Sequence, residues 1–419
     1  MAFSYTRLPR MSSSSSSFSQ LSISPDSNPE EDVIYEYEKK KKKREVSNFV
    51  FGHKTRFYIM VLLLFCLTLP QMNSITFNFT VICMGDLVER HQTLNRSAIG
   101  AVIGLIPSVP LIDALGIRVV LTVSGVISAV GSIFFPLAAD INYYAVILCR
   151  VLQGLGISIL FTVVGVIPGI WAPRNETGTF LAILSCAFQL SMIICMPISG
   201  ILCETPYLGW RSIYYIFGAA TLLIYTIFFT FYTDSPRIHR NVSEKELKRI
   251  ESGKLETPVQ EGVPYWAICS DVTVLAAWLS VFGGNFGFTI LTLYGPTYLK
   301  DVLHFDVKET GFATALPFIL SAVVKFAAGR ISDKMDHLSE KRCRQHVHFA
   351  ITVISFCAYL IHFGAPIVVG WLTSSEGDTG GWSRLFIIVS VITVLTNLPF
   401  PFLTSEEPAP FVRVVKVEE

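Results

Sequence analysis

The chain has 419 residues, of which 51% are hydrophobic and 16% charged, and its mean hydropathy of +0.52 lies well above that of water-soluble proteins. These values argue against a water-soluble enzyme, and a net charge of +1 does not fit the clustered basic surface of a nucleic-acid-binding protein. The apolar residues occur in runs of about 20 separated by short polar stretches, which is the pattern of α-helices that cross a bilayer. The sequence therefore predicts an all-α, multi-pass membrane protein.

Residues 1–56 are polar, with a serine run and the basic block Lys39–Arg44, and we expect a disordered cytoplasmic tail. The second apolar stretch after this tail is short, because only 15 residues, 98–112, are uninterrupted, and they include Pro107 and Pro110. We expect a short or re-entrant helix there. In all, ten apolar stretches are predicted to span the membrane: 57–84, 98–115, 119–138, 143–171, 179–203, 212–232, 272–299, 311–329, 347–371 and 382–403.

The longest polar interruption, 234–271, is predicted to be a cytoplasmic linker between helical bundles at 57–233 and 272–405, with a tail at 406–419. The 33 Lys and Arg residues divide into 25 on the side of the N-terminal tail, 5 on the opposite side and 3 within spans. Because basic residues favour the cytoplasmic side, both termini are predicted to be cytoplasmic. Asn95 lies in a sequon on the opposite side and is the expected glycosylation site, whereas Asn175 and Asn241 are expected to stay unmodified.

Arg150 is the charged residue that lies farthest inside a predicted span, seven residues or about 10 Å from the start of the fourth stretch. A charge at this depth is costly and usually functional, and a guanidinium can bind a carboxylate or phosphate through two hydrogen bonds. The alternative is an ion pair with another helix, although no Asp or Glu lies at comparable depth in the predicted spans. We therefore expect Arg150 to bind an anionic substrate, with Gln153 adding a neutral hydrogen bond from the same helix face.

Other polar groups in the spans allow two interpretations each. Lys325 is a second candidate for substrate binding, but it lies near the inner end of its span and could extend to the headgroups. Asn285, like Asn73 and Asn78, is an amide in an apolar run that either lines a path or bonds between helices. His348 and the nine cysteines are interpreted as structural, and no metal-ligand spacing or nucleophile and base pair predicts an enzyme.

Three groups of motifs resemble the anion:cation symporter branch of the major facilitator superfamily, solute carrier family 17, which includes sialin, the vesicular glutamate transporters and the sodium-phosphate cotransporters. In the first half they are Cys-Arg150-Val-Leu-Gln153-Gly, Gly-Ile-Trp-Ala-Pro-Arg-Asn-Glu176 and Gly-Trp-Arg-Ser-Ile-Tyr-Tyr-Ile-Phe-Gly218. In the second half, Gly329-Arg-Ile-Ser-Asp333-Lys resembles the loop signature of the superfamily. Asp113-Ala-Leu-Gly116-Ile-Arg118 is a weaker copy in the first half.

This resemblance implies two bundles that alternate access to a central site and carry organic anions or phosphate, with Na⁺ or H⁺ as the driving ion. Arg150 matches the arginine of the fourth helix in that family. A lipid bilayer and a small anion are the implied partners, nucleic acid is not, no cofactor is expected, and the chain is expected to be monomeric. The implied location is the plasma membrane or a vesicle or lysosome membrane.

Several positions depart from the family pattern. Ile157 and Gly284 replace a glutamate and an arginine of the relatives that carry glutamate, and Thr76 replaces an arginine of the sialin-like members. Only about ten of the usual twelve helices are recognisable. Two functions therefore stay open: a secondary transporter, Na⁺-coupled or driven by the membrane potential, and a shortened relative that binds or regulates without transporting.

Overall fold

The computed structural model describes residues 52–84, 97–252, 265–335 and 379–403, together with 361, 364, 365, 368 and 369. This part of the chain is helical and contains no β-strand. The all-α prediction is confirmed, because eight helical segments of the described residues are long and apolar enough to cross a membrane. They are Thr55–Cys83, Ala114–Ile133, Tyr143–Trp171, Arg174–Glu204, Gly209–Phe231, Val272–Val302, Val307–Ala327 and Gly380–Asn397.

These segments match eight of the ten predicted spans. The predicted second span is helical but forms one long helix with the third, and most of the ninth, including His348, lies outside the described residues. The helices of the first half are α2 (Thr55–Thr80), η1 (Val81–Cys83), α4 (Ser97–Ile133), α5 (Phe135–Ile141), α6 (Tyr143–Ile157), α7 (Leu160–Trp171), η2 (Arg174–Glu176), α8 (Thr177–Ser185), α9 (Ala187–Glu204) and α10 (Gly209–Phe231).

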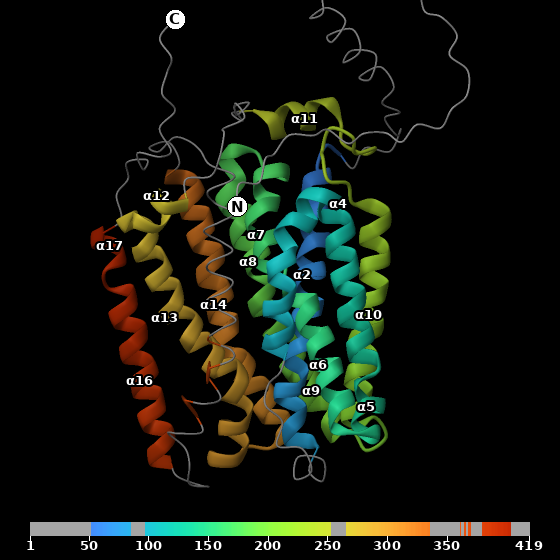
Figure 1. The fold of residues 1–419 in the computed structure, drawn as a ribbon, viewed down its shortest axis with the longest axis vertical. Helices are drawn as coiled ribbons and strands as arrows, with labels where there is room; N and C mark the ends of the chain where they lie inside the picture. The colour runs from blue at the N-terminus through green and yellow to red at the C-terminus, as the bar shows by residue number, and fades with distance from the viewer. Residues whose placement is uncertain are drawn as a thin grey trace, which may run out of the picture. The chain divides into compact units, whose positions relative to one another are not determined.

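The remaining helices lie in the linker and the second half. They are α11 (Glu244–Glu251), α12 (Tyr265–Ser270), α13 (Val272–Thr297), the π-helical turn η3 (Tyr298–Val302), α14 (Val307–Met335), α16 (Thr379–Asn397) and α17 (Phe400–Leu403). Figure 1 shows α11 at one end of the long helices and α5 near the other. The predicted linker thus carries a helix, α11, whose N-cap Ser243 accepts a hydrogen bond from the Glu246 amide.

Two predicted spans are broken rather than continuous. The fourth is interrupted between α6 and α7, where the Ser158 hydroxyl donates to the Leu155 carbonyl. The fifth is interrupted between α8 and α9, where the Ser185 hydroxyl donates to the Ala182 carbonyl. A serine that bonds to the carbonyl three residues back competes with the backbone ladder. Ser191 makes the same bond within the uninterrupted α9, so this bond alone does not produce an interruption.

The helix α4 bends sharply at Gly116, whose φ of +81° is not helical. The side chain of Asp234, which follows α10, accepts a hydrogen bond of 2.9 Å from the Arg118 amide, where the helix resumes. The Arg118 guanidinium bonds to the Phe229 carbonyl in the last turn of α10, where carbonyls lack partners within the helix. The bend therefore joins α4 to the end of α10.

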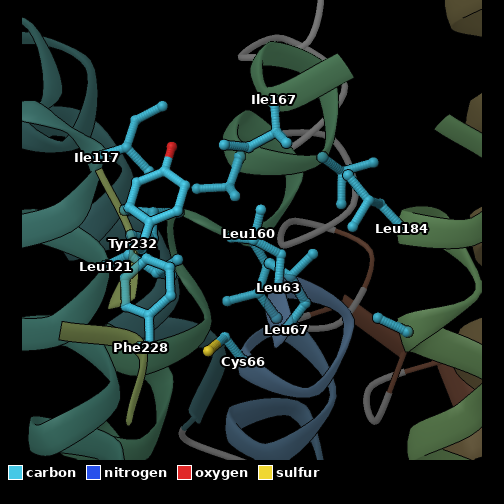
Figure 2. Packing of buried hydrophobic residues seen from close by; sticks show 14 of the residues in the cluster. Leu63, Cys66, Leu67, Ile117, Leu121, Leu160, Ile167, Leu184, Phe228 and Tyr232 are labelled. Carbon is cyan, nitrogen blue, oxygen red and sulfur yellow. The ribbon is translucent and has the colours of Figure 1, made fainter. Parts of the chain in front are cut away.

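The largest apolar cluster lies where α2, α4, α7 and α10 meet. Leu63 and Leu67 of α2 are completely buried and lie beside Leu160 of α7, while Leu121 of α4 lies next to Phe228 of α10 in the same cluster (Figure 2). In the bilayer the lipid chains are as apolar as these side chains, so close packing and polar bonds hold the helices together. Around α2, the neighbours in contact are α4, α6, α8, α9, α10 and α13 (Figure 1).

Two of the cysteines, which were interpreted only as structural residues, form a disulfide that the sequence analysis did not predict. Cys83, at the end of α2, forms a disulfide with Cys203, near the end of α9, and their Cα atoms are 6.2 Å apart. The two residues are separated by 120 positions, so only the packing of α2 on α9 brings them together. We call this end of the helices the disulfide end and the opposite one the α11 end.

Candidate functional site

Arg150 lies in α6 and is buried, with 3% of its surface exposed. Its Nη1 atom donates to the Ser74 carbonyl of α2 at 2.8 Å and to the Gln153 Oε1 atom at 2.7 Å. The guanidinium carbon lies 4.8 Å from the centroid of the Phe77 ring, within cation–π range. Arg150 and Gln153 thus lie on one helix face and bond to each other, and their binding of an anion stays a prediction.

A layer of buried polar side chains continues from Arg150 across four helices. Gln153 donates to the Ser132 hydroxyl of α4 at 3.0 Å. Asn73 of α2 donates to Ser128 of α4 at 3.2 Å and to Thr221 of α10 at 3.0 Å. We call this set the polar layer: Asn73, Ser128, Ser132, Arg150, Gln153 and Thr221.

The polar layer places a cation and several hydrogen-bonding groups in a region from which water is excluded. Electrostatic attraction is stronger there than in water because the effective dielectric constant is lower. The Oδ1 atom of Asn73 is buried without a hydrogen-bond partner among the described residues, so the layer can accept one more donor. The arrangement can hold an anion at Arg150 once the helices separate enough to admit it.

Lys325 of α14 lies at the contact between the two halves of the chain. Its Nζ atom donates to the Gln189 Oε1 atom of α9 at 3.1 Å and to the Ser185 carbonyl at 3.4 Å. The ammonium group therefore bonds to neighbouring helices, and the structure does not show the extension toward headgroups that its position had suggested. Arg150 and Lys325 are not joined by a hydrogen bond, and each bonds to a different set of helices.

The predicted amides occupy different environments. Asn285 is half-buried, and its amide donates to the Val281 carbonyl of its own helix, so it makes no bond to the polar layer. Asn78 is buried and donates to the Thr292 carbonyl of α13 at 3.4 Å, which joins α2 to the second half. Thr76 is buried and its hydroxyl donates to the Met72 carbonyl.

The structure describes only parts of the two predicted loop motifs, which are residues 113–118 and 329–334. Gly116 and Arg118 form the bend of α4, with Asp234 as a partner that the sequence motif did not contain. Asp113 lies within α4, and Gly329 and Asp333 lie within α14. The side chains of Asp113 and Asp333, the surroundings of Gly329 and the whole of Asn95 lie outside the described part.

A charge network at the α11 end was not foreseen. Arg56, near the start of α2, is buried and donates to both oxygens of Glu176 at 3.1 and 3.2 Å. Its backbone amide donates to Glu246 of α11 at 2.9 Å, and Arg249 donates to Glu176 at 2.8 Å. These contacts were not predictable from the sequence, because they join segments up to 190 residues apart.

This fold and site define a class of protein. It is a multi-pass helical membrane protein with a buried arginine in a polar layer. The family model of the Major Facilitator Superfamily matches residues 63–414, and the chain belongs to this family of membrane transporters. Within the described residues no group of three or more His, Cys, Asp or Glu side chains could hold a metal ion.

Comparison with curated proteins confirms the resemblance to sialin and the phosphate transporters. The chain is 31% identical to human sialin over 238 residues, which are 56% of this chain and 48% of sialin. It is 31% identical to human sodium-dependent phosphate transport protein 1 over 209 residues, which are 49% of this chain and 44% of that protein. The chain thus spans about half the length of the curated relatives it matches.

Among solved structures, the chain is similar to the xylose transporter XylE from E. coli in a partially occluded inward-open conformation. The TM-score is 0.54 at 14% identity, and the match covers 84% of this chain and 100% of that one. A second structure, described as a D-xylose-proton symporter, matches with a TM-score of 0.55 at 14% identity, covering 84% and 98%. At this level of identity the similarity establishes the fold alone.

Proposed function

We propose that this transporter carries small anions, either organic acids or inorganic phosphate, by alternating access. The observation that carries the proposal is Arg150, a guanidinium with 3% of its surface exposed inside a membrane-crossing helix. Keeping a cation at this depth is costly, and such residues generally serve a ligand or an ion path. The guanidinium has the geometry to bind carboxylate or phosphate oxygens, and Gln153 and Asn73 offer further polar groups beside it.

Contacts between the two halves support the alternating-access part of the proposal. Helix α14 packs along α8 and α9, and a Cβ atom at Gly311 would lie 2.6 Å from the Met196 carbonyl oxygen. The Glu204 carboxylate accepts a hydrogen bond from the Lys308 amide at the start of α14. A close interface with few polar bonds can separate at one end while it stays packed at the other, which is what alternation requires.

The relatives favour an anion as the cargo. One of them is named for sodium-dependent phosphate transport, and the chain shares about 30% identity with it and with sialin. We propose Na⁺ coupling or drive by the membrane potential, both termini in the cytoplasm, and a plasma, vesicle or lysosome membrane as the location. Lys325 and Asn285 are proposed to contact the anion in conformations other than the one described.

The test is uptake of a panel of labelled organic acids and phosphate by the full chain in proteoliposomes, with Na⁺ gradients and membrane potential imposed separately. Gln153→Glu is the sharpest variant, because it keeps the shape of the side chain 2.7 Å from Arg150 and neutralises the guanidinium. We expect uptake to fall at least about tenfold, since hydrogen bonds to charged groups contribute about 1.5–3 kcal/mol each. Arg150→Ala should give a similar loss.

The matched control is Arg211→Gln, which removes an exposed arginine paired with Asp140 at the disulfide end. It should retain uptake near the wild-type level. Unchanged uptake in both Gln153→Glu and Arg150→Ala would reject the site. Anion binding by a wild-type chain that shows no uptake under any gradient would support the alternative, a membrane protein that binds anions without transporting them.

A further inference from the structure

A cavity of about 380 Å³ lies at the α11 end, between the start of α2, the turn η2 and the helix α11. This volume falls in the range of small-molecule sites, and the cavity is distinct from the polar layer because it shares no residue with it. Its lining residues come from three separate segments of the chain. They are Gly52, His53, Lys54, Arg56, Phe57, Glu176, Lys245, Glu246 and Arg249.

The two carboxylates of the lining are held by the two arginines. Glu176 accepts hydrogen bonds from Arg56 and Arg249, and Glu246 accepts one from the Arg56 backbone amide. Arg56 and Glu246 are both almost completely buried. These four charges cancel one another and fix the walls of the cavity.

Two lysines of the lining have no ion-pair partner among the residues that the structure describes. Lys54 precedes the first turn of α2, and Lys245 lies in the first turn of α11. Both are exposed, and neither makes an ion pair or a side-chain hydrogen bond with any described residue. Because helix N-termini carry partial positive charge, the start of α2, whose first turn contains no acidic residue, adds to the attraction for an anion.

Glu246 supplies a different feature. Its Oε1 atom is bonded to Arg56, but its Oε2 atom is buried and has no hydrogen-bond partner among the described residues. A buried acceptor without a donor is costly. Glu246 lines the cavity, so a small rotation of its side chain would bring this oxygen within reach of a hydroxyl on a ligand whose anionic group contacts the lysines.

We propose that this cavity binds a phosphate ester, with the phosphate contacting Lys54 and Lys245 and a neighbouring hydroxyl donating to Glu246. A phosphate has enough acceptor oxygens for both lysines, and the ester part carries the hydroxyl. Two kinds of ligand contain a phosphate with a neighbouring hydroxyl. One is a phospholipid whose headgroup is a polyol, and the other is a soluble polyol phosphate. The site is separate from anion transport at Arg150 and does not depend on it.

The experiment measures binding to the purified full chain in detergent by native mass spectrometry. The probes are dioctanoyl phosphatidylinositol, its soluble headgroup inositol monophosphate, and methyl phosphate, which lacks the neighbouring hydroxyl. The double variant Lys54→Gln/Lys245→Gln should weaken binding at least about tenfold, since each lysine loses a charge-assisted hydrogen bond. Methyl phosphate should bind more weakly than inositol monophosphate.

The matched control is Lys248→Gln, an exposed lysine of the same helix α11 that does not line the cavity. It should bind like the wild type. Binding of the lipid alone identifies a headgroup of the bilayer as the ligand, and equal binding of inositol monophosphate identifies a soluble ester. Equal binding by the double variant and the control, or no binding of any probe, would overturn the proposal.

Arg150→Ala separates this site from the transport site. The variant should lose uptake and keep the binding of dioctanoyl phosphatidylinositol or inositol monophosphate at the α11 end. Loss of phosphate ester binding in Arg150→Ala with no loss in the lysine double variant would assign the binding to the polar layer and contradict the cavity as the site.

Discussion

Proline residues inside the spans leave carbonyls without their usual donor, and side chains of neighbouring helices bond to two of them. Pro70 of α2 cannot donate to the Cys66 carbonyl, and the Tyr225 hydroxyl of α10 does so at 2.6 Å. Pro296 of α13 likewise leaves the Thr292 carbonyl free, and the Asn78 amide donates to it. With no water in the bilayer core, such bonds allow a proline to be tolerated and also join helices.

Removing the Tyr225 hydroxyl should therefore destabilise the helix packing. Tyr225→Phe leaves the Cys66 carbonyl buried without a donor, at a cost of about 1–3 kcal/mol. We expect a lower midpoint of thermal unfolding in detergent. Tyr207→Phe removes a hydroxyl from a side chain that is 97% exposed and should leave the midpoint unchanged, so equal midpoints for the two variants would contradict this account.

For single residues of the polar layer, the sequence indicated which side chains are unusual more readily than which groups they bond to. Arg150 stood out because a charge inside an apolar run is rare, and Gln153 followed from the spacing of one helical turn. The Ser132 hydroxyl and the Ser74 carbonyl were not predictable, because they come from other helices whose rotation only the packing determines. Serines occur throughout such helices and carry no signal of their own.

Among the helices, α4 shows how a single residue can set a bend. At Gly116 the positive φ favours glycine, and the Asp234 carboxylate lies against the place where a Cβ atom would stand. The sequence placed Gly116 in a loop motif. Asp234, whose carboxylate leaves no room for a side chain at Gly116, lies more than 100 residues away in the chain. The helices themselves were predictable from hydropathy, whereas the interruptions at Ser158 and Cys186 fall inside continuous apolar runs and leave no signal in hydropathy.

Gly116→Ala should be destabilising for both reasons, because backbone strain at a non-glycine residue costs about 1–3 kcal/mol before the clash is counted. The midpoint of thermal unfolding is the measurement. Gly284→Ala provides the control, since a Cβ atom there meets no atom within 4 Å and the position lies inside the helix α13. Alanine at that position should be neutral or stabilise by up to about 1 kcal/mol. A stable Gly116→Ala variant would show that the bend tolerates a side chain.

For the whole molecule, the disulfide and the charge distribution support the same orientation. Disulfides persist in oxidising compartments, and Cys83 and Cys203 lie at the end opposite to α11 and the basic linker. The α11 end carries Arg56, Arg249 and the segment of Asn241, whose carbonyl accepts a bond from Thr55. Both observations favour a cytoplasmic α11 end.

The orientation predicts which sequon carries a glycan. Asn95 follows the disulfide end of α2 in the chain, so Asn95→Gln should remove the shift in gel mobility that a glycosidase produces. Asn175→Gln and Asn241→Gln should leave that shift intact. A glycan mapped to Asn241 would invert the orientation.

The coupling ion is the last property that belongs to the whole molecule. Proton symport needs a group inside the membrane that gains and loses a proton as the site alternates. Ile157, where the glutamate-carrying relatives place a carboxylate, is buried in the main apolar cluster. Glu204 is exposed at the end of α9, and its carboxylate accepts a hydrogen bond from the Lys308 amide, so it lies at the end of its span and not inside it.

We therefore expect uptake to depend on Na⁺ or on membrane potential and not on a proton gradient. Wild-type chain in proteoliposomes should show no uptake under a pH gradient imposed at clamped potential without Na⁺. A carboxylate introduced by Ile157→Glu would lie inside the span, where a group that gains and loses a proton can couple transport to protons, so uptake by this variant should become dependent on pH. Ile157→Gln adds a polar group that cannot titrate and should stay independent of pH. Robust wild-type uptake under the pH gradient alone would contradict the prediction. It would mean that protons drive transport although residue 157 is an isoleucine and cannot carry one.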